Sequence, residues 1–528
     1  MPIRVLMVDD NSGWLDICSR TLLRKFRNRK ISIEIQCAES FKQAIILLET
    51  SQFDLLIVDL RFPSPTGEGM GGLEIISKSV NLDTLRPIIV ASAYGSQEIV
   101  RETFKRGVFD FYDKTDPEQE LIDVVERAIQ QYEEKILRAG NPFTPMTGIT
   151  PTVFGGRVKE LEFFDEKLKR ALNTNFLEHF LVLGNWGIGK STLLREYKKI
   201  CQSRGYIAVI VPLESLPAGT SSLEAVRSIV EGIIRDLPYS LGDFKRVVSF
   251  FDSVGVNILG TGIQFKRDTT PKEIPTQAFL HDTLMELWKD LKDKTDIFVV
   301  LLDDLGNFKD ASEIVMTLRQ TLSMEAVQKA KILFGLASTP THWLEVTSTD
   351  RHHPLARYFL SRVELEPLQE TELIDTVAKS LANTGVHFAP EVLALVYAYT
   401  QGHPYEMQVL CHHLFNNQLS RRVNLEVWEK SLQVALRDLG LAVFAHWCQQ
   451  ASQDEAKVLS LLATVDKALT VKEIQEAGQS QKIALSSGNL AKYLQRLVEK
   501  RLIEKAGRGQ YVIPDAMFRA YLRSYSSL

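Results

Sequence analysis

The chain has 528 residues, of which 45% are hydrophobic and 24% are charged, and its formal net charge is −4. This composition is typical of a globular protein with about three to four domains, and it provides no overall excess of positive charge for a nucleic acid or a membrane surface. Any DNA-binding face must therefore be local.

The first 137 residues alternate short apolar runs with amphipathic helical stretches. This alternation predicts a parallel, doubly wound sheet that binds ligands at the carboxyl ends of its strands. The expected strands are residues 3–8, 31–37, 55–58, 87–91 and 108–112, and the expected helices are 12–27, 40–50, a helix from 72, and 118–137.

Polar residues follow four of these strands. Asp9 and Asp10 end the first strand, Asp59 the third, and Ser92 and Lys114 follow the fourth and fifth. Three converging carboxylates repel one another, so they imply a bound hard cation such as Mg²⁺. A lysine and a hydroxyl opposite them could stabilise phosphoryl oxygens.

This set of residues resembles the flavodoxin-like receiver domain of two-component response regulators, over about residues 1–130. The resemblance implies that a sensor histidine kinase phosphorylates Asp59 and that Asp9 and Asp10 hold Mg²⁺ together with it. The resemblance also implies that Ser92 is the switch hydroxyl, Lys114 the essential lysine and Phe111 the switch aromatic.

Two features depart from the receiver pattern. Residues 63–72 form a longer segment, richer in Gly and Pro, than usually follows the acceptor aspartate, and Thr115 replaces the common proline after the lysine. The alternative is a degenerate receiver that only mediates contacts. The five intact polar positions favour a receiver that is phosphorylated.

Residues 139–152 are dense in Pro, Gly and Thr and cannot hold a helix, which predicts an interdomain linker. Residues 184–191 then read Gly-Asn-Trp-Gly-Ile-Gly-Lys-Ser, a complete phosphate loop between a strand-like run and a helical stretch. Its glycines let backbone N–H groups surround a phosphate, its lysine can reach the β- and γ-phosphates of ATP, and its serine can bind Mg²⁺. The predicted nucleotide-binding residues of this loop are Gly184, Gly187, Gly189, Lys190, Ser191 and Thr192.

A second apolar run, residues 297–302, ends in the paired acids Asp303 and Asp304. It predicts a buried parallel strand that brings carboxylates to the nucleotide edge of a sheet. An ordinary buried strand with a helix-capping aspartate is the alternative. The position of the run, more than a hundred residues after the phosphate loop, favours the nucleotide site.

These elements resemble the AAA+ and STAND (signal transduction ATPase with numerous domains) classes of P-loop ATPase. The resemblance implies that Asp303 supports the Mg²⁺ shell and that Asp304 is the general base for the attacking water. It also places Arg157, in a Gly-Arg-x-x-Glu-Leu segment, beside the adenine, and Thr339 at the sensor position after the next strand. The resemblance also implies an arginine that reaches the nucleotide of a neighbouring subunit. Arg357 and Arg362 are the candidates, and each could equally be a surface residue. Finally, it implies a Gly-x-Pro motif in the lid, which contains Pro404.

The last 78 residues predict three helices followed by two strands around a Gly-Arg-Gly turn, which resembles a winged helix-turn-helix. Residues 451–528 carry twelve basic and eight acidic side chains. Lys492, Arg496 and Lys500 recur every four residues on one helix face, and Arg508 lies in the turn. Such a stripe suits DNA phosphates, although it could also be a solvated face of a module that serves packing or autoinhibition.

We therefore expect a multidomain α/β protein in which phosphorylation of Asp59 gates an ATP- and Mg²⁺-dependent switch, with slow ATP hydrolysis and nucleotide-dependent homo-oligomers. The alternatives are a DNA-binding transcription regulator, and a defence or scaffold sensor whose winged helix does not bind DNA. Scattered cysteines and the lack of a long apolar run favour a cytoplasmic protein without a membrane segment. The predicted divisions are a receiver at 1–137, a linker at 138–152, a P-loop ATPase domain at 153–365, a helical lid at 366–450 and a winged helix at 451–528.

Overall fold

The computed structural model describes residues 3–29, 31–51, 53–61, 71–82, 86–93, 101, 103–138, 140–146, 151–174, 176–213, 222–238, 256–259, 262–265, 275–307, 311–348, 359–382, 384–418, 421–481, 483 and 487–525. The chain forms two compact units. The first comprises Met1–Val153, Ile374–Tyr399 and Gln408–Leu528, and the second comprises Phe154–Leu373 and Thr400–Met407. None of the helices in the described ranges combines the length and apolar character needed to cross a bilayer.

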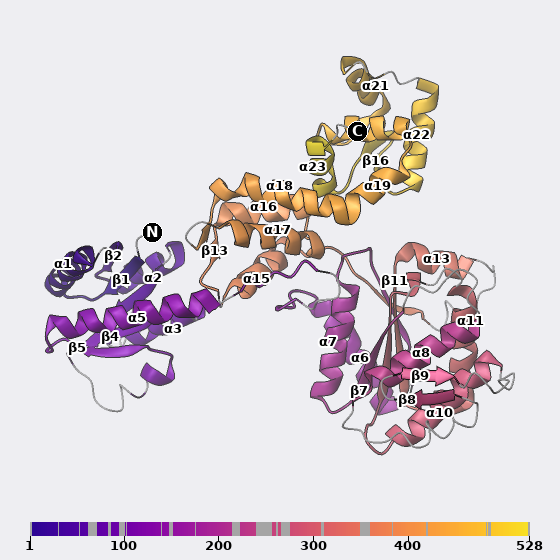
Figure 1. Ribbon diagram of the computed structural model, residues 1–528, viewed down its shortest axis with the longest axis horizontal. Coiled ribbons are helices and arrows are strands. Elements are labelled where there is room, and N and C mark those ends of the chain that lie inside the picture. Colours follow the sequence, from indigo (N-terminus) through magenta and orange to yellow (C-terminus); the bar gives the residue numbers. More distant parts are fainter. Residues whose placement is uncertain are drawn as a thin grey trace. The chain divides into compact units, whose positions relative to one another are not determined.

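The N-terminal part of the first unit is a five-stranded parallel sheet with the order β2-β1-β3-β4-β5 (Figure 1). This flavodoxin-like order confirms the doubly wound sheet predicted from the sequence. It places the ends of β1, β3, β4 and β5 at one edge, where the predicted polar residues lie. The strands are β1 (Ile3–Val8), β2 (Ile33–Ala38), β3 (Leu55–Val58), β4 (Ile88–Ser92) and β5 (Asp110–Asp113).

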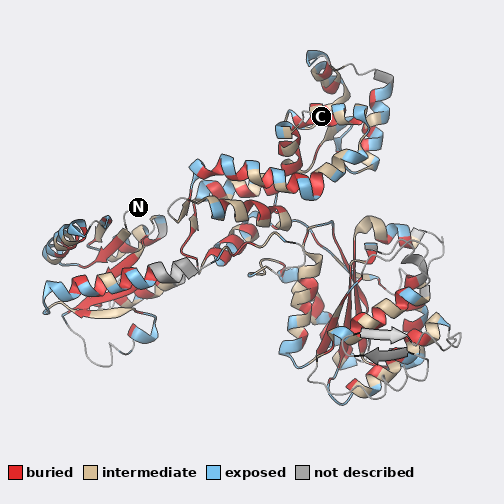
Figure 2. Cartoon of the chain, in the orientation of Figure 1, coloured by how far each residue is buried: buried red, intermediate tan, exposed pale blue. Residues whose placement is uncertain are grey.

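Helices cover both faces of this sheet because its inner strands are apolar on both sides. Val5 and Met7 of β1 pack in one core with α1 (Ser12–Asn28) and α5 (Glu118–Arg138). The alternate residues of β1, Leu6 and Val8, pack in a second core, with α2 and α3. The inner strands β3 and β4 are buried throughout, the edge strands β2 and β5 are only partly buried, and the helices alternate buried and exposed faces (Figure 2). The second pair of helices is α2 (Phe41–Thr50) and α3 (Gly71–Leu82).

The rest of the first unit is mainly helical. A short parallel bridge joins β13 to β14, and a π-helix, η4, connects α18 to α19. The C-terminal residues add an antiparallel sheet with the order β15-β17-β16. The helices and strands of residues 370–450, of which 370–373 and 400–407 belong to the second unit, are α15 (Glu370–Leu381), β13 (His387–Phe388), α16 (Pro390–Thr400), α17 (Pro404–Asn417), β14 (Arg422–Val423), α18 (Trp428–Leu439), η4 (Gly440–Phe444) and α19 (Ala445–Gln450). Those of the C-terminal module are α20 (Gln453–Ala463), β15 (Leu469–Thr470), α21 (Val471–Ser480), α22 (Ser487–Glu499), β16 (Glu504–Gly507), β17 (Gln510–Val512) and α23 (Ala516–Tyr525).

The second unit contains another five-stranded parallel sheet, with the order β12-β6-β11-β10-β7. The strand before the phosphate loop, β6, and the strand that ends in Asp303, β10, are separated by β11. The end of β11 therefore lies between the two motifs. The strands are β6 (Phe180–Leu183), β7 (Ile207–Pro212), β10 (Phe298–Asp303), β11 (Ile332–Ser338) and β12 (Ser361–Glu364).

Two apolar layers sandwich this second sheet. One is formed by α6 (Val158–Thr174) and α7 (Lys190–Ser203), and the other includes α8 (Ser222–Asp236) and α10 (Thr276–Leu291). The arrangement is the helix-covered parallel sheet expected of a P-loop ATPase fold. Further elements are α11 (Ala311–Leu322), α12 (Glu325–Lys329), α13 (Pro340–Ser348) and an antiparallel pair, β8 (Val256–Leu259) and β9 (Gly262–Phe265).

Candidate functional sites

The first candidate site is an acidic pocket at the carboxyl edge of the N-terminal sheet. Asp9 is fully buried, Asp59 is largely buried and Asp10 is exposed. One carboxylate oxygen from each of them lies within 4.8 Å of the others. The Lys114 Nζ donates to Asp9 Oδ2 at 2.5 Å and to Asp59 Oδ2 at 2.6 Å. The structure thus brings four of the five predicted residues into direct proximity.

Burial controls the ionisation of this pocket. It raises the pKa of Asp9, although hydrogen bonds from Lys114 and from the Asn11 N–H oppose the rise. Burial also lowers the pKa of Lys114, but its hydrogen bonds and attraction to Asp59 and Asp9 outweigh this, and the net pKa is raised. A single lysine therefore neutralises part of a buried acidic cluster, which leaves negative charge for a divalent cation.

Ser92 lies at the end of β4 and is 1% exposed. Its Oγ is buried and makes no hydrogen bond to any residue that the structure describes. A buried hydroxyl without a partner costs free energy unless something else binds it. Together with the carboxylates, it fits a site that holds Mg²⁺ and a phosphoryl group. Phe111, three residues before Lys114, packs against the core that α2 and α3 form.

Two features of this pocket were not predicted from the sequence. The Lys114 ammonium lies 4.7 Å from the centre of the Trp14 ring, a cation–π contact that helps to hold the lysine in place. Gly72, in the first turn of α3, is required because an added Cβ would lie 2.2 Å from the Asp59 carbonyl oxygen. Most of the Gly- and Pro-rich segment before Gly72 lies outside the described residues.

The second candidate site is the phosphate loop between β6 and α7. Gly187 and Gly189 have positive φ values of 75° and 101°, which favour glycine. The Lys190 Nζ donates to the Gly184 and Asn185 carbonyl oxygens, at 2.9 and 3.0 Å. The lysine is therefore bound to its own loop, in the region where a phosphate would replace these acceptors. Thr192 lies half-buried in the first turn of α7.

Ser191 and Asp303 meet beside this loop, since the serine hydroxyl donates to the aspartate carboxylate. Burial raises the pKa of Asp303, with the Ser191 hydrogen bond opposing it. The other carboxylate oxygen, Oδ1, is buried and lacks a hydrogen-bond partner within the described ranges. A serine hydroxyl and a carboxylate with a free oxygen fit Mg²⁺.

Asp304 has a φ of 61°, a left-handed conformation that is uncommon for a residue with a side chain. Such backbone strain concentrates at functional sites. Burial lowers the pKa of Lys190, opposed by attraction to Asp304 and Asp303, so the lysine and both acids interact electrostatically. At the end of β11, the Ser338 Oγ is buried and unpaired in the described part of the chain, while the Thr339 Oγ1 accepts from the His342 N–H. The Ser338 hydroxyl is therefore unpaired within the described residues, while the Thr339 hydroxyl accepts one bond and keeps its own proton to donate.

Arg157, at a φ of 65°, donates to the Ile188 carbonyl oxygen at 3.0 Å and to Glu160 at 3.1 Å, so it braces the phosphate loop from behind. The Arg362 side chain is 59% exposed and pairs with Glu364. Arg357 lies outside the described residues. Pro404 begins α17, and His403 before it bonds the loop through the Trp186 carbonyl oxygen at 3.1 Å.

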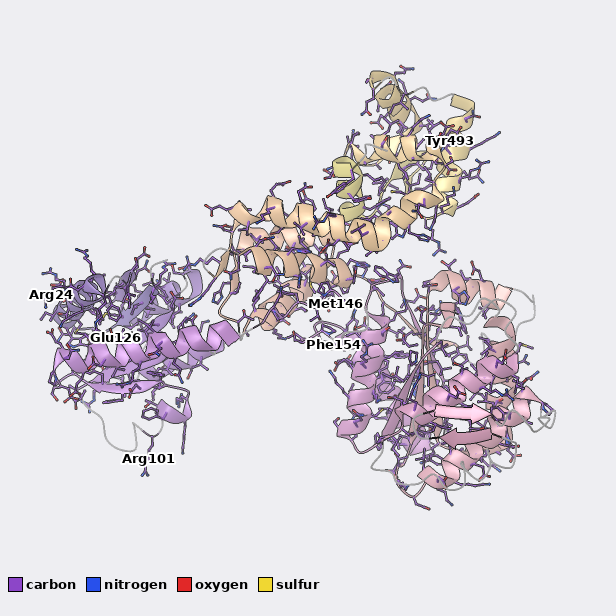
Figure 3. The ribbon with its side chains drawn as sticks, in the orientation of Figure 1. Arg24, Arg101, Glu126, Met146, Phe154 and Tyr493 are labelled. Atoms are coloured by element: carbon purple, nitrogen blue, oxygen red, sulfur yellow. The ribbon has the colours of Figure 1, made fainter. Side chains whose placement is uncertain are left out.

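In the C-terminal module, Lys492 and Arg496 on α22 and Arg508 between β16 and β17 are exposed. Lys500 differs, since its Nζ donates to the buried Glu455 at 2.6 Å. Of the three side chains of the predicted stripe, Lys492 and Arg496 are therefore exposed, whereas Lys500 is held in an ion pair. Tyr493 lies on α22 between Lys492 and Arg496 in the sequence (labelled in Figure 3). Its hydroxyl donates to Asp454 Oδ2 at 2.9 Å.

The family model of the response regulator receiver domain matches residues 5–126. The DNA-binding transcriptional regulator NtrC of Salmonella typhimurium is 25% identical over 153 residues, and the regulatory protein AtoC of Escherichia coli is 29% identical over 127. These alignments cover 28% and 24% of the chain, but only 30% and 25% of the length of the two relatives. Among solved structures, the Walker-type ATPase PABY2304 of Pyrococcus abyssi matches 70% of the chain and 96% of its own, with a TM-score of 0.48 and 15% identity. Residues 5–126 thus match the receiver domain family model, and the second unit is a helix-covered parallel sheet with a phosphate loop after β6.

Proposed function

We propose that the protein is a phosphorylation-regulated ATPase switch. The observation that carries the proposal is the presence of two phosphate-chemistry sites on one chain, each with its charged and hydroxyl groups assembled. The Asp9–Asp59–Lys114 pocket would receive the signal, and the phosphate loop would hold ATP. A sensor histidine kinase is the phosphodonor that a receiver implies, and both this donor and ATP would be met in the cytoplasm.

In the pocket, a carboxylate oxygen of Asp59 attacks the phosphorus of the phosphohistidine. The bond between phosphorus and the imidazole nitrogen breaks, and its electron pair stays on the imidazole. Lys114, which already touches Asp59, turns to a phosphoryl oxygen, and the free Ser92 hydroxyl donates to another. Movement of Ser92 would draw Phe111 with it and change the surface near β4 and β5.

At the phosphate loop, Lys190 would exchange its two carbonyl acceptors for oxygens of the β- and γ-phosphates. Ser191 and Asp303 would hold Mg²⁺, which neutralises phosphate charge when bound. Asp304 would orient the attacking water and accept its proton. We expect slow hydrolysis that times a conformational or assembly state, with homo-oligomers as the active form.

A second function, ATP-dependent DNA binding for transcription, is favoured by the exposed Lys492, Arg496 and Arg508. If the C-terminal module is a winged helix that contacts DNA, replacing Arg496 with alanine should weaken binding and reduce its salt dependence. A sensor or scaffold would show nucleotide-dependent assembly without DNA affinity.

Light scattering of the full chain tests the proposed switch. ATP and Mg²⁺ are added with and without beryllofluoride, which mimics the phosphoryl group on Asp59, and Lys190→Ala is the control. We expect a larger assembly only when both ligands are present, and none for the control. A constant mass that the control shares would contradict an assembly switch.

A further inference from the structure

The segment between the receiver and the ATPase region does not behave throughout as the open linker that its composition predicts. Phe143 is 1% exposed. Its ring lies 6.0 Å from the Phe388 ring and 6.5 Å from the Phe415 ring, measured between centroids. By contrast Met146, three residues later, is 71% exposed (Figure 3). A buried aromatic side chain in the middle of a Pro- and Gly-rich segment indicates a fixed attachment point.

Hydrogen bonds surround this aromatic contact. The Asn141 Nδ2 donates to the His412 carbonyl oxygen at 3.0 Å and to Asn416 Oδ1 at 2.8 Å. The His412 ring completes the set, because its Nε2 accepts from Asn416 at 3.0 Å, which leaves Nδ1 to donate to the Phe143 carbonyl oxygen at 2.8 Å. These bonds fix both the backbone and the side chains of the segment.

All of the polar partners lie on one helix, α17. The Thr144 N–H donates to Gln408 Oε1 at 3.0 Å, so the partners are Gln408, His412 and Asn416. Residues spaced by four lie on one face of a helix. We call residues 141–144 the anchor segment, since they run along this face and bury Phe143 beside it.

The first turn of the same helix contacts the phosphate loop. The Glu406 N–H donates to His403 Nδ1 at 3.5 Å, so His403 Nε2 carries the proton and donates to the Trp186 carbonyl oxygen at 3.1 Å. The Tyr405 and Trp186 rings lie 4.7 Å apart. A Cβ on Gly187 would lie 2.7 Å from the His403 ring, which shows how closely the two segments approach.

Very little chain separates the receiver from the anchor segment. The helix α5 begins four residues after Lys114 and ends at Arg138, three residues before Asn141. Three residues span at most about 11 Å when fully extended, so there is little slack to absorb a displacement of α5. The helix α17 has 14 residues and no internal glycine or proline, and can move as a rod about 21 Å long.

We propose that the anchor segment transmits the state of the receiver to α17, which passes it to the phosphate loop through His403 and Tyr405. This inference rests on the proposed function, because it names the route by which phosphorylation reaches the nucleotide.

Two insertions of equal length test the route. Six residues, Gly-Ser-Gly-Ser-Gly-Ser, are added either before the anchor, between Ala139 and Gly140, or after it, between Gly148 and Ile149. Neither insertion removes a packed side chain. The measurement is the dissociation rate of a fluorescent ADP analogue from the full chain, with Mg²⁺, in the presence and absence of beryllofluoride. Because beryllofluoride can also bind beside ADP in the phosphate loop, the ratio of the two rates is corrected by the same ratio measured for Asp59→Asn.

In the wild type, we expect beryllofluoride to change this rate about 5- to 150-fold, the usual range of coupling between two sites. The insertion after the anchor should keep this ratio, and the insertion before it should bring the ratio to about 1. The opposite pattern, or equal ratios in the two insertions, would overturn the proposed route. A wild-type ratio of 1 would instead refute the gating function itself, and the route with it.

Point variants of Phe143 provide a second test of the contact between the anchor segment and α17. Phe143→Ala should lower the ratio to about 1, while Phe143→Leu, which keeps an apolar side chain in the site, should retain most of it. Both should bind ADP as the wild type does when beryllofluoride is absent. If Phe143→Ala binds ADP normally and keeps the full ratio, the anchor does not carry the signal.

Discussion

His179 precedes β6, the strand that leads into the phosphate loop, and its ionisation should set the acid stability of the second unit. Its Nδ1 accepts the Phe334 N–H at 3.1 Å, and its ring packs near Phe334 and Phe359. Burial lowers the pKa of His179 from 6.5 to about 4. The folded state therefore holds this imidazole neutral, while the unfolded chain binds a proton below pH 6.5.

The direction and size of this pH effect on the free energy of unfolding follow from proton linkage. A folded-state pKa below the unfolded value stabilises the fold above pH 6.5, and this contribution is lost as the pH falls from 6.5 towards 4. A pKa difference of about 2.5 corresponds to about 3 kcal/mol in the free energy of unfolding, of which about 2 kcal/mol is lost by pH 5. The matched variant is His179→Gln, which keeps a side-chain acceptor for the Phe334 N–H but cannot be protonated.

Urea unfolding of the full chain, followed by tryptophan fluorescence at pH 7 and pH 5, measures the effect. The wild type should lose about 2 kcal/mol more than His179→Gln between these two values, in the transition of the second unit. Equal losses in the two proteins would refute the conclusion that His179 is held neutral by burial.

Three further changes have defined outcomes. Gly402→Ala should destabilise the second unit by about 1–3 kcal/mol in urea unfolding, because its φ is 79° and a Cβ would lie 1.9 Å from the Leu368 carbonyl oxygen; an unchanged unfolding midpoint would show that the backbone adapts. Lys114→Met should greatly reduce beryllofluoride binding yet tighten Mg²⁺ binding, because it removes the cation that neutralises Asp9 and Asp59. Titration calorimetry measures both affinities, and a loss of Mg²⁺ binding as well would contradict this expectation. Arg157→Lys should weaken ATP binding about tenfold, because lysine cannot make both of the bonds that brace the Ile188 carbonyl oxygen and Glu160; unchanged affinity would mean that the loop needs no brace.

Local patterns predicted both sheets and their functional edges. In β1, the apolar run that ends in Asp9 and Asp10 indicated a buried strand, and the structure places it between β2 and β3 in the receiver sheet, with both acids at its end. The phosphate loop could also be predicted from the sequence, since Lys190 and Ser191 belong to a motif that lies between a strand and a helix.

Contacts between distant residues were not predictable in this way. Phe143 lies in a segment whose composition indicates a linker, and its burial depends on rings more than 240 residues later in the chain. Lys500 fits a helical stripe by spacing, but its ion pair with Glu455 comes from packing between α20 and α22. Arg157 belongs to a motif visible in the sequence, whereas its contact with the back of the phosphate loop required the folded chain.

The most direct test of the central claim is the rate of ATP hydrolysis by the full chain, with and without beryllofluoride, compared with Asp59→Asn. We expect beryllofluoride to change the wild-type rate beyond any change in Asp59→Asn, where it can act only at the phosphate loop, and we expect Lys190→Ala to abolish hydrolysis. Equal responses of the wild type and Asp59→Asn would contradict a receiver that gates the ATPase.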